Sequence, residues 1–253
     1  MFNKLQFIPP NTFNITKRKE FAAVLSLNGY VDQVFEFAFN MTFGAVGHHR
    51  DHRTGGITQR KKAELFINAF QGKLAEFGVY KKLVDNGIET TKPDLRLMGT
   101  GLWDDSDFIC ANKKLSVKSA AYFSNLMLLE QQDWNGQGAY IPNSESGTTM
   151  YDYFILCRIK PDGKQMLRDH KEVFFKDEID KIELKRLMIN GKSWLMDIPG
   201  FVTHKELVSI INDGFILPQK ALLNGKIEMD AANYYVQSGD LHPFEELVKL
   251  LAF

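Results

Sequence analysis

The stretch that most constrains the fold is the almost uninterrupted apolar and aromatic run YDYFILCRI at residues 151–159. A strand that is apolar on both faces must be covered on both sides, as in the centre of a sheet in an α/β protein. The sequence Pro-Asp-Gly at residues 161–163 ends the run with a turn. We therefore expect a central mixed β-sheet flanked by helices, in the α/β or α+β class.

Length and composition favour one globular domain. The chain has 253 residues, of which 44% are hydrophobic and 25% are charged, which is ordinary for a soluble protein. No convincing linker interrupts it, so we expect a single domain over residues 1–253. Within it, residues 1–92 are predicted to be mainly helical, residues 93–160 to form the core of the sheet, and residues 161–253 to be mixed.

Three features favour a cytoplasmic protein without a membrane partner. No apolar run approaches the roughly 18–20 residues that a membrane span needs. The N-terminal sequence MFNKLQFIPPNTF lacks the pattern of a secretory signal. Cys110 and Cys157 both lie in apolar, strand-like runs, so we expect them to be reduced and buried thiols.

Helical periodicity is strongest in the first third of the chain, where helices are expected over 17–27, 31–42 and 59–85, the last ended by Gly87. The apolar stripe of the longest helix consists of Ala63, Phe66, Phe70, Phe77 and Val84. The other predicted elements are strands over 95–98, 107–111 and 114–118, a helix over 120–129, helices near 179–187, 204–212 and 243–251, and short strands near Trp194 and Tyr234–Tyr235.

The segment DFICANKKLSVK, Asp107 to Lys118, is predicted to be a β-hairpin. If Asn112-Lys113 is its two-residue turn, Asp107 lies directly opposite Lys118 and Ile109 opposite Ser116. Directly opposed residues have Cβ atoms roughly 4.5–5.5 Å apart. An acid and a lysine this close can bind a metal ion and a phosphate together. The alternative is a surface salt bridge, worth about 0–1 kcal/mol.

Further oxygen ligands and charges are candidates for the same site. The main-chain carbonyl of Val117 can add an oxygen ligand of the kind that Mg²⁺ prefers. Glu130 ends the helix predicted after the hairpin. Lys73 and Glu76 lie on or beside the apolar stripe of the long helix, so we expect both charges to point towards the sheet. The alternative is an exposed helix face with an acid and a base three residues apart.

The order of an acid that opens a strand, an x-V-K strand, a helix and an apolar strand resembles the core of the PD-(D/E)XK nucleases, which include the type II restriction endonucleases. Three segments carry the resemblance: FINAFQGKLAEFGVY, LWDDSDFICANKKLSVKSAAYFSNLMLLE and YDYFILCRI. They cover roughly residues 50–160. The motif itself is short and degenerate, so its order and context supply the specificity.

The resemblance implies a role for several residues. Asp107 matches the aspartate that binds the metal, Lys118 the motif lysine, and Glu76 a helix glutamate found in many members. Ser116 departs from the pattern, because Asp or Glu usually stands there. Members with an S-x-K pattern take the missing carboxylate from the following helix, which indicates Glu130.

Two other carboxylates stay open as alternatives. Asp133 can replace Glu130 as the acid that compensates for the serine. The proline–aspartate pair of the motif can instead be Pro93-Asp94, although Asp94 is distant in sequence from the motif lysine and is not expected on the adjoining strand.

The resemblance implies a type II restriction endonuclease that cuts double-stranded DNA with Mg²⁺ and acts as a homodimer. Arg50, Arg53 and Arg60, in and after a basic glycine-rich loop, are candidate DNA contacts together with Ser116; plain solvent exposure of the arginines is the alternative. Residues 1–62 hold nine Lys/Arg against four Asp/Glu, which suits a basic face although the net charge is zero. The alternative functions are a repair or junction nuclease on the same core and a catalytically inactive DNA-binding protein.

Overall fold

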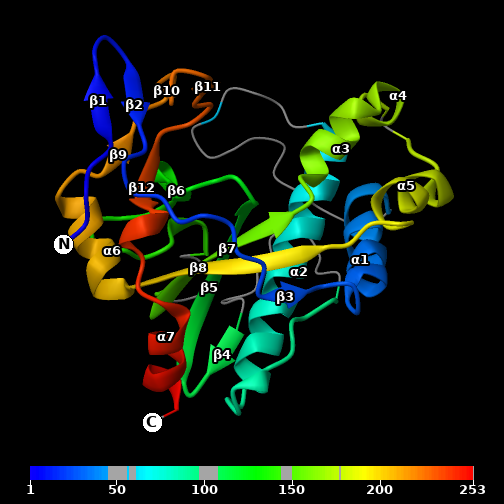
Figure 1. The fold of residues 1–253 in the computed structure, drawn as a ribbon, viewed down its shortest axis with the longest axis horizontal. Coiled ribbons are helices and arrows are strands. Elements are labelled where there is room, and N and C mark those ends of the chain that lie inside the picture. Colours follow the sequence, from blue (N-terminus) through cyan, green and yellow to red (C-terminus); the bar gives the residue numbers. More distant parts are fainter. Residues whose placement is uncertain (45–55, 57–60, 97–107, 144–149, 177, 253) are drawn as a thin grey trace.

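A five-stranded mixed sheet lies at the centre of the fold, with the strand order β3-β8-β7-β5-β4 (Figure 1). The computed structural model describes residues 1–44, 56, 61–96, 108–143, 150–176 and 178–252. The strands of the central sheet are β3 (Leu25–Ser26), β4 (Phe108–Cys110), β5 (Lys113–Ala121), β7 (Tyr153–Lys160) and β8 (Leu195–Thr203). β5 and β7 are parallel, and the other neighbours are antiparallel. The predicted mixed class of helices and sheet is confirmed.

Two long helices, α1 (Val31–Phe43) and α2 (Lys62–Asp85), pack against each other, and α2 also packs against β5 and β7 on one face of this sheet (Figure 1). Both are close to the predicted bounds, and Gly87, with a φ of +76°, follows the end of α2. The buried part of the predicted stripe consists of Ala63, Phe66, Phe70 and Phe77. Val84, expected on this stripe, is exposed, and its neighbour Leu83 is buried in the last turn of α2 instead.

β7 is covered on both faces, as its apolar sequence predicts. Ile155, Cys157 and Ile159 belong to a buried cluster between the sheet and helices α1 and α2, which we call the first core. Phe154 and Leu156 belong to a cluster on the opposite face, which we call the second core. The strand therefore separates the two cores. Cys157 and Cys110 are both buried and form no disulfide, as expected.

A small sheet and helix α6 (His204–Asn212) cover the second core. This three-stranded sheet has the order β6-β12-β9, with β6 (Leu126–Glu130), β9 (Ile216–Leu217) and β12 (Asn233–Gln237). The helix predicted over 120–129 is wrong, because β5 continues to Ala121 and the run LMLLE then pairs with β12, Leu128 opposite Tyr235. A short apolar run is ambiguous between helix and strand, and here the partner strand decides.

The N-terminal region differs most from the prediction. No helix forms over 17–27; the segment is extended and leads into β3. The buried guanidinium of Arg158 explains this, because it donates hydrogen bonds to the carbonyls of Lys19 (2.7 Å) and Glu20 (2.9 Å), which a helix would use internally. Ahead of it, β1 (Gln6–Ile8) and β2 (Thr12–Asn14) join β10 (Leu222–Leu223) and β11 (Ile227–Glu228) in a four-stranded sheet.

The C-terminal half contains the helices that the sequence predicts near 179–187, 204–212 and 243–251. The helices are α3 (Gly163–Asp169), α4 (Lys171–Phe174), α5 (Lys181–Met188), α6 (His204–Asn212) and α7 (Phe244–Leu251), with 3₁₀ turns at Gln131–Asp133, Ile141–Asn143 and Ser238–Asp240. Of the strand predicted over 95–98, residues 95 and 96 are in no strand and the rest lies outside the described residues. Within the described ranges, no helix has the length and apolar character to cross a membrane.

Candidate active site

The β4–β5 hairpin has a register different from the predicted one. Its turn residues are Ala111 and Asn112, with φ values of +48° and +58°, and Ile109 pairs with Lys114. The predicted turn at Asn112-Lys113, with Ile109 opposite Ser116, is therefore wrong. A two-residue hairpin turn of this kind needs positive φ at both central residues. The predicted opposition of Asp107 and Lys118 involves a residue outside the described ranges.

Ala111 occupies a conformation that costs an alanine roughly 1–2 kcal/mol. Because asparagine tolerates positive φ better, we expect Ala111→Asn to increase the free energy of unfolding by about 0.5–1 kcal/mol. Urea denaturation followed by circular dichroism measures this. Ala23→Asn, on an exposed segment without positive φ, is the matched control and should change little; an equal gain in both variants would contradict the explanation.

Lys118 lies on β5 and projects away from the first core. Ser116 and Lys118 share one face of the strand, because side chains alternate, and they pair with Phe154 and Leu156 of the second core. Ser116 is buried and Lys118 is half-buried. The Lys118 ammonium lies 5.8 Å from the centroid of the Trp134 ring, a separation at which a cation is attracted to an aromatic face. The Lys118 side chain is thus partly shielded from water and lies beside the apolar ring of Trp134.

The segment Glu130–Trp134 lies on this side of the sheet, because Trp134 belongs to the second core. Glu130 ends β6 and precedes the 3₁₀ turn that carries Asp133. Asp133 is only 7% exposed and adjoins Trp134, the aromatic partner of Lys118. The candidate acids predicted from a following helix therefore lie at the end of a strand and in a 3₁₀ turn. Asp133 directly precedes Trp134 in the chain, whereas Glu130 lies four residues before it.

Glu76 lies on α2, which covers the opposite face of the sheet from Lys118. Its carboxylate forms an ion pair with Lys73 at 2.6 Å, and both side chains are nearly buried, at 12% and 11% exposed. The alternative of an exposed helix face is therefore wrong. The Lys73 ammonium also lies 5.3 Å from the centroid of the Phe37 ring on α1. The structure does not bring Glu76 onto the Lys118 face of β5.

The alternative aspartate, Asp94, belongs to the surroundings of Lys73 rather than to those of Lys118. A hydrogen bond from Arg96, together with the charges of Arg96 and Lys73, holds the pKa of Asp94 below its ordinary value, although partial burial opposes this. Arg96 also forms an ion pair with Asp94 at 2.6 Å. The Asp94 carboxylate is therefore already paired with Arg96 and is also stabilised by the charge of Lys73 on α2.

Part of the predicted site lies outside the described residues: Asp107, Arg50, Arg53 and Arg60. Val117, predicted to offer its carbonyl, packs its side chain against the first core. Among the described residues, no group of three or more His, Cys, Asp or Glu side chains is arranged to hold a metal ion. Within the described residues, Glu130 and Asp133 therefore belong to no such group.

Sequence reasoning does not single out Trp134 or Asp152. The Asp152 carboxylate accepts a hydrogen bond from the main-chain N–H of Lys114 (2.9 Å) and from the Lys113 ammonium (3.2 Å). It thereby fixes the start of β5 beside the start of β7. In the sequence, only the position of each residue could have identified it. Asp152 directly precedes the apolar run, and Trp134 follows an acid after a strand.

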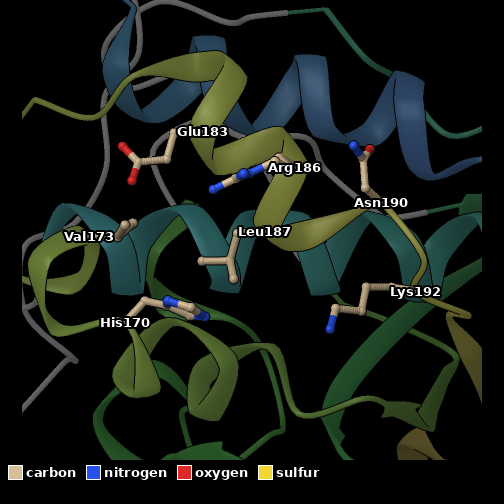
Figure 2. Close-up of a pocket in the computed structure, with 7 residues that line it drawn as sticks. All are labelled: His170, Val173, Glu183, Arg186, Leu187, Asn190 and Lys192. Atoms are coloured by element: carbon tan, nitrogen blue, oxygen red, sulfur yellow. The ribbon is translucent and has the colours of Figure 1, made fainter.

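A separate pocket of about 250 Å³ lies between α4, α5 and the turn after α5 (Figure 2). Figure 2 shows Glu183, Arg186 and Asn190 along its α5 side, with Leu187 among them. The remaining lining residues are His170, Val173 and Lys192. None of the predicted site residues lines this pocket.

Comparisons with protein-family models, with curated proteins and with solved structures found no match for this chain.

Proposed function

We propose that this protein hydrolyses phosphodiester bonds in double-stranded DNA with Mg²⁺ as cofactor, as type II restriction endonucleases do. The observation that carries the proposal is the position of Lys118 on β5. Lys118 is half-buried and shares a strand face with buried Ser116. Its ammonium lies close to the ring of Trp134, which directly follows Asp133 in the chain. The strand order also supports it. A short strand preceded by an acid forms a hairpin with the x-V-K strand, which in turn runs parallel to the apolar strand β7.

In this proposal each residue has a distinct task. Asp107 and Asp133 would hold the metal, with Glu130 as the alternative to Asp133. A metal bound there would lower the pKa of a coordinated water and stabilise charge on the phosphate. The Lys118 ammonium would contact a phosphate oxygen and offset the negative charge that develops in the transition state. The Trp134 ring limits access of water to one side of that ammonium, which strengthens its electrostatic effect.

A homodimer acting on a palindromic site is part of the proposal, because a twofold axis of the protein matches a twofold axis of the DNA. A second candidate, a DNA-binding protein without catalytic activity, is favoured by one observation. Ser116 is buried and stands where a metal-binding acid is expected, so the metal site depends on carboxylates from other segments.

Plasmid or phage DNA incubated with the protein and Mg²⁺ tests these candidates. We expect discrete fragments in Mg²⁺ and none in EDTA. Smearing or structure-selective nicking would favour the repair nuclease, and binding without cleavage would favour the inactive protein. Asp133→Ala should reduce cleavage more than Glu130→Ala, because Asp133 is buried beside Trp134. If neither substitution lowers the rate, the idea of a compensating carboxylate fails.

A further inference from the structure

The turn between β5 and β6 carries an exposed aromatic side chain at its tip. Phe123 is 57% exposed, and its ring meets the Tyr122 ring edge to face with centroids 5.3 Å apart. Tyr122 meets Phe21 in the same manner at 5.9 Å. Leaving a phenylalanine in water forgoes roughly 1.5–3 kcal/mol of burial. Phe123 is thus the exposed end of a small aromatic surface, whose other two rings, Phe21 and Tyr122, are half-buried.

Hydrogen bonds within the turn and to neighbouring segments fix the conformation of this turn. The Ser124 N–H donates to the carbonyl of Ala121 (2.8 Å), and the Arg158 guanidinium donates to the Ser124 carbonyl (3.3 Å). The Asn125 side-chain oxygen accepts hydrogen bonds from the Lys19 N–H (3.1 Å) and the Ser238 hydroxyl (2.6 Å). A ligand that contacts the aromatic surface therefore meets a turn that is already ordered, and binding costs less conformational entropy.

The charges around the turn suit a polyanion. The Lys160 ammonium lies 5.3 Å from the centroid of the Tyr122 ring, and the Lys160 side chain is exposed. Lys17 and Arg18 are exposed on the segment whose main chain bonds to the turn. Glu20 is the acid on that segment, so cations outnumber it. Aromatic faces interleaved with lysine and arginine are typical of surfaces that bind unpaired nucleotides.

The aromatic surface lies on the same side of the sheet as Lys118. Tyr122 follows Lys118 by four positions, so strand alternation places both on one face, roughly 13 Å apart at 3.3 Å per residue. The N–H of Tyr122 still bonds to the carbonyl of Ile159 (3.0 Å), which continues the pairing of β5 with β7 to this point. This separation corresponds to about four nucleotide steps along one DNA strand at 3.4 Å each.

We propose that Phe21, Tyr122 and Phe123, together with Lys160, form a stacking platform for an unpaired base of a DNA strand. Phe123 supplies the stacking face, and Lys160 binds the adjoining phosphate. The choice of DNA as the ligand rests on the proposed function, whereas the platform itself requires no cleavage. It would engage a base about four steps from the phosphate that Lys118 contacts.

The test measures binding of a fluorescein-labelled single-stranded 12-mer to the full chain by anisotropy at several salt concentrations. Phe123→Ala should weaken binding by about tenfold, since loss of one stacked base costs roughly 1–3 kcal/mol, and Phe123→Trp should restore it. Lys160→Ala should reduce the slope of log K against log salt by about 0.7, the value for one phosphate of a single strand.

Phe175→Ala is the matched control, because Phe175 is 62% exposed on a different surface. An equal loss of binding in this variant, or no loss in Phe123→Ala, would overturn the platform, as would absence of single-strand binding by the unaltered chain. If Phe123→Ala instead turns a dimer into a monomer at unchanged DNA affinity, the surface serves a second copy and the proposal is wrong. Lys118→Ala leaves the stacking platform intact, so this variant should still bind the single-stranded 12-mer. The proposals on cleavage and on stacking can therefore be contradicted separately.

Discussion

Replacing Lys118 with alanine is expected to reduce Mg²⁺-dependent cleavage of plasmid DNA by about 10²–10³-fold, the cost of removing one group that stabilises developing charge. We expect this loss because Lys118 lies on the same strand face as Ser116 and is half-buried beside the Trp134 ring. Initial rates from a supercoiled-to-linear conversion assay measure the effect. Binding to labelled duplex in Ca²⁺ should stay within a few-fold, because the proposed role concerns the transition state more than the ground state.

Two variants keep the Lys118 experiment decisive. Lys118→Met preserves most of the apolar contact with Trp134 and removes the charge, so it should be as inactive as the alanine variant yet fully folded. Lys113→Ala removes a cation from the same strand, where it pairs with Asp152 at the surface, and should leave cleavage nearly unchanged. Full activity of Lys118→Met would remove Lys118 from the site.

Replacing Asp197 with alanine is expected to lower the free energy of unfolding by about 3–5 kcal/mol, because it leaves a buried guanidinium without its counter-charge. Arg158 is 1% exposed, and its Nε donates to Asp197 at 3.0 Å. The same guanidinium binds the carbonyls of Lys19 and Glu20. The pair therefore fixes the N-terminal segment across the sheet, and its loss should release that segment.

Urea denaturation gives the stability, and amide hydrogen exchange over residues 16–22 reports the release of the segment. Asp85→Ala is the control, since it breaks a surface pair with Lys81 and should cost under about 1 kcal/mol. The double variant Arg158→Met with Asp197→Leu should be more stable than Asp197→Ala, because no unpaired charge stays buried. A cost for Asp197→Ala as small as that of Asp85→Ala would contradict this explanation.

The long periodic elements were predictable because local pattern decides them. The stripe Ala63 to Phe77 identifies α2, and the apolar run identifies β7 as a strand between two cores. α6 is observed over His204–Asn212, as predicted, with a capping box in which Thr203 and Glu206 satisfy each other's main-chain N–H. In each case propensity, periodicity and end signals agree.

The candidate site was predictable only in part. Lys118 was identified from the order of strands and charges, and its half-buried position on the parallel strand β5 is consistent with that hypothesis. The source of the compensating carboxylate depended on whether the run at 126–130 was a helix or a strand. Pairing with β12, more than 100 residues later in the chain, decides this, and a single sequence does not show such a partner.

By itself, the sequence determined the mixed class of the fold, the two long helices and the central buried strand, and it led to the hypothesis that Lys118 contacts a phosphate. Only the tertiary structure decided the register of the β4–β5 hairpin, the strand character of Leu126–Glu130 and the extended course of the N-terminal segment. The physical reason is the same for all three. A distant partner strand and a buried arginine that needs carbonyl acceptors override local propensity, and the hairpin register holds Ala111 at positive φ at a cost of roughly 1–2 kcal/mol. None of the three can be read from neighbouring residues.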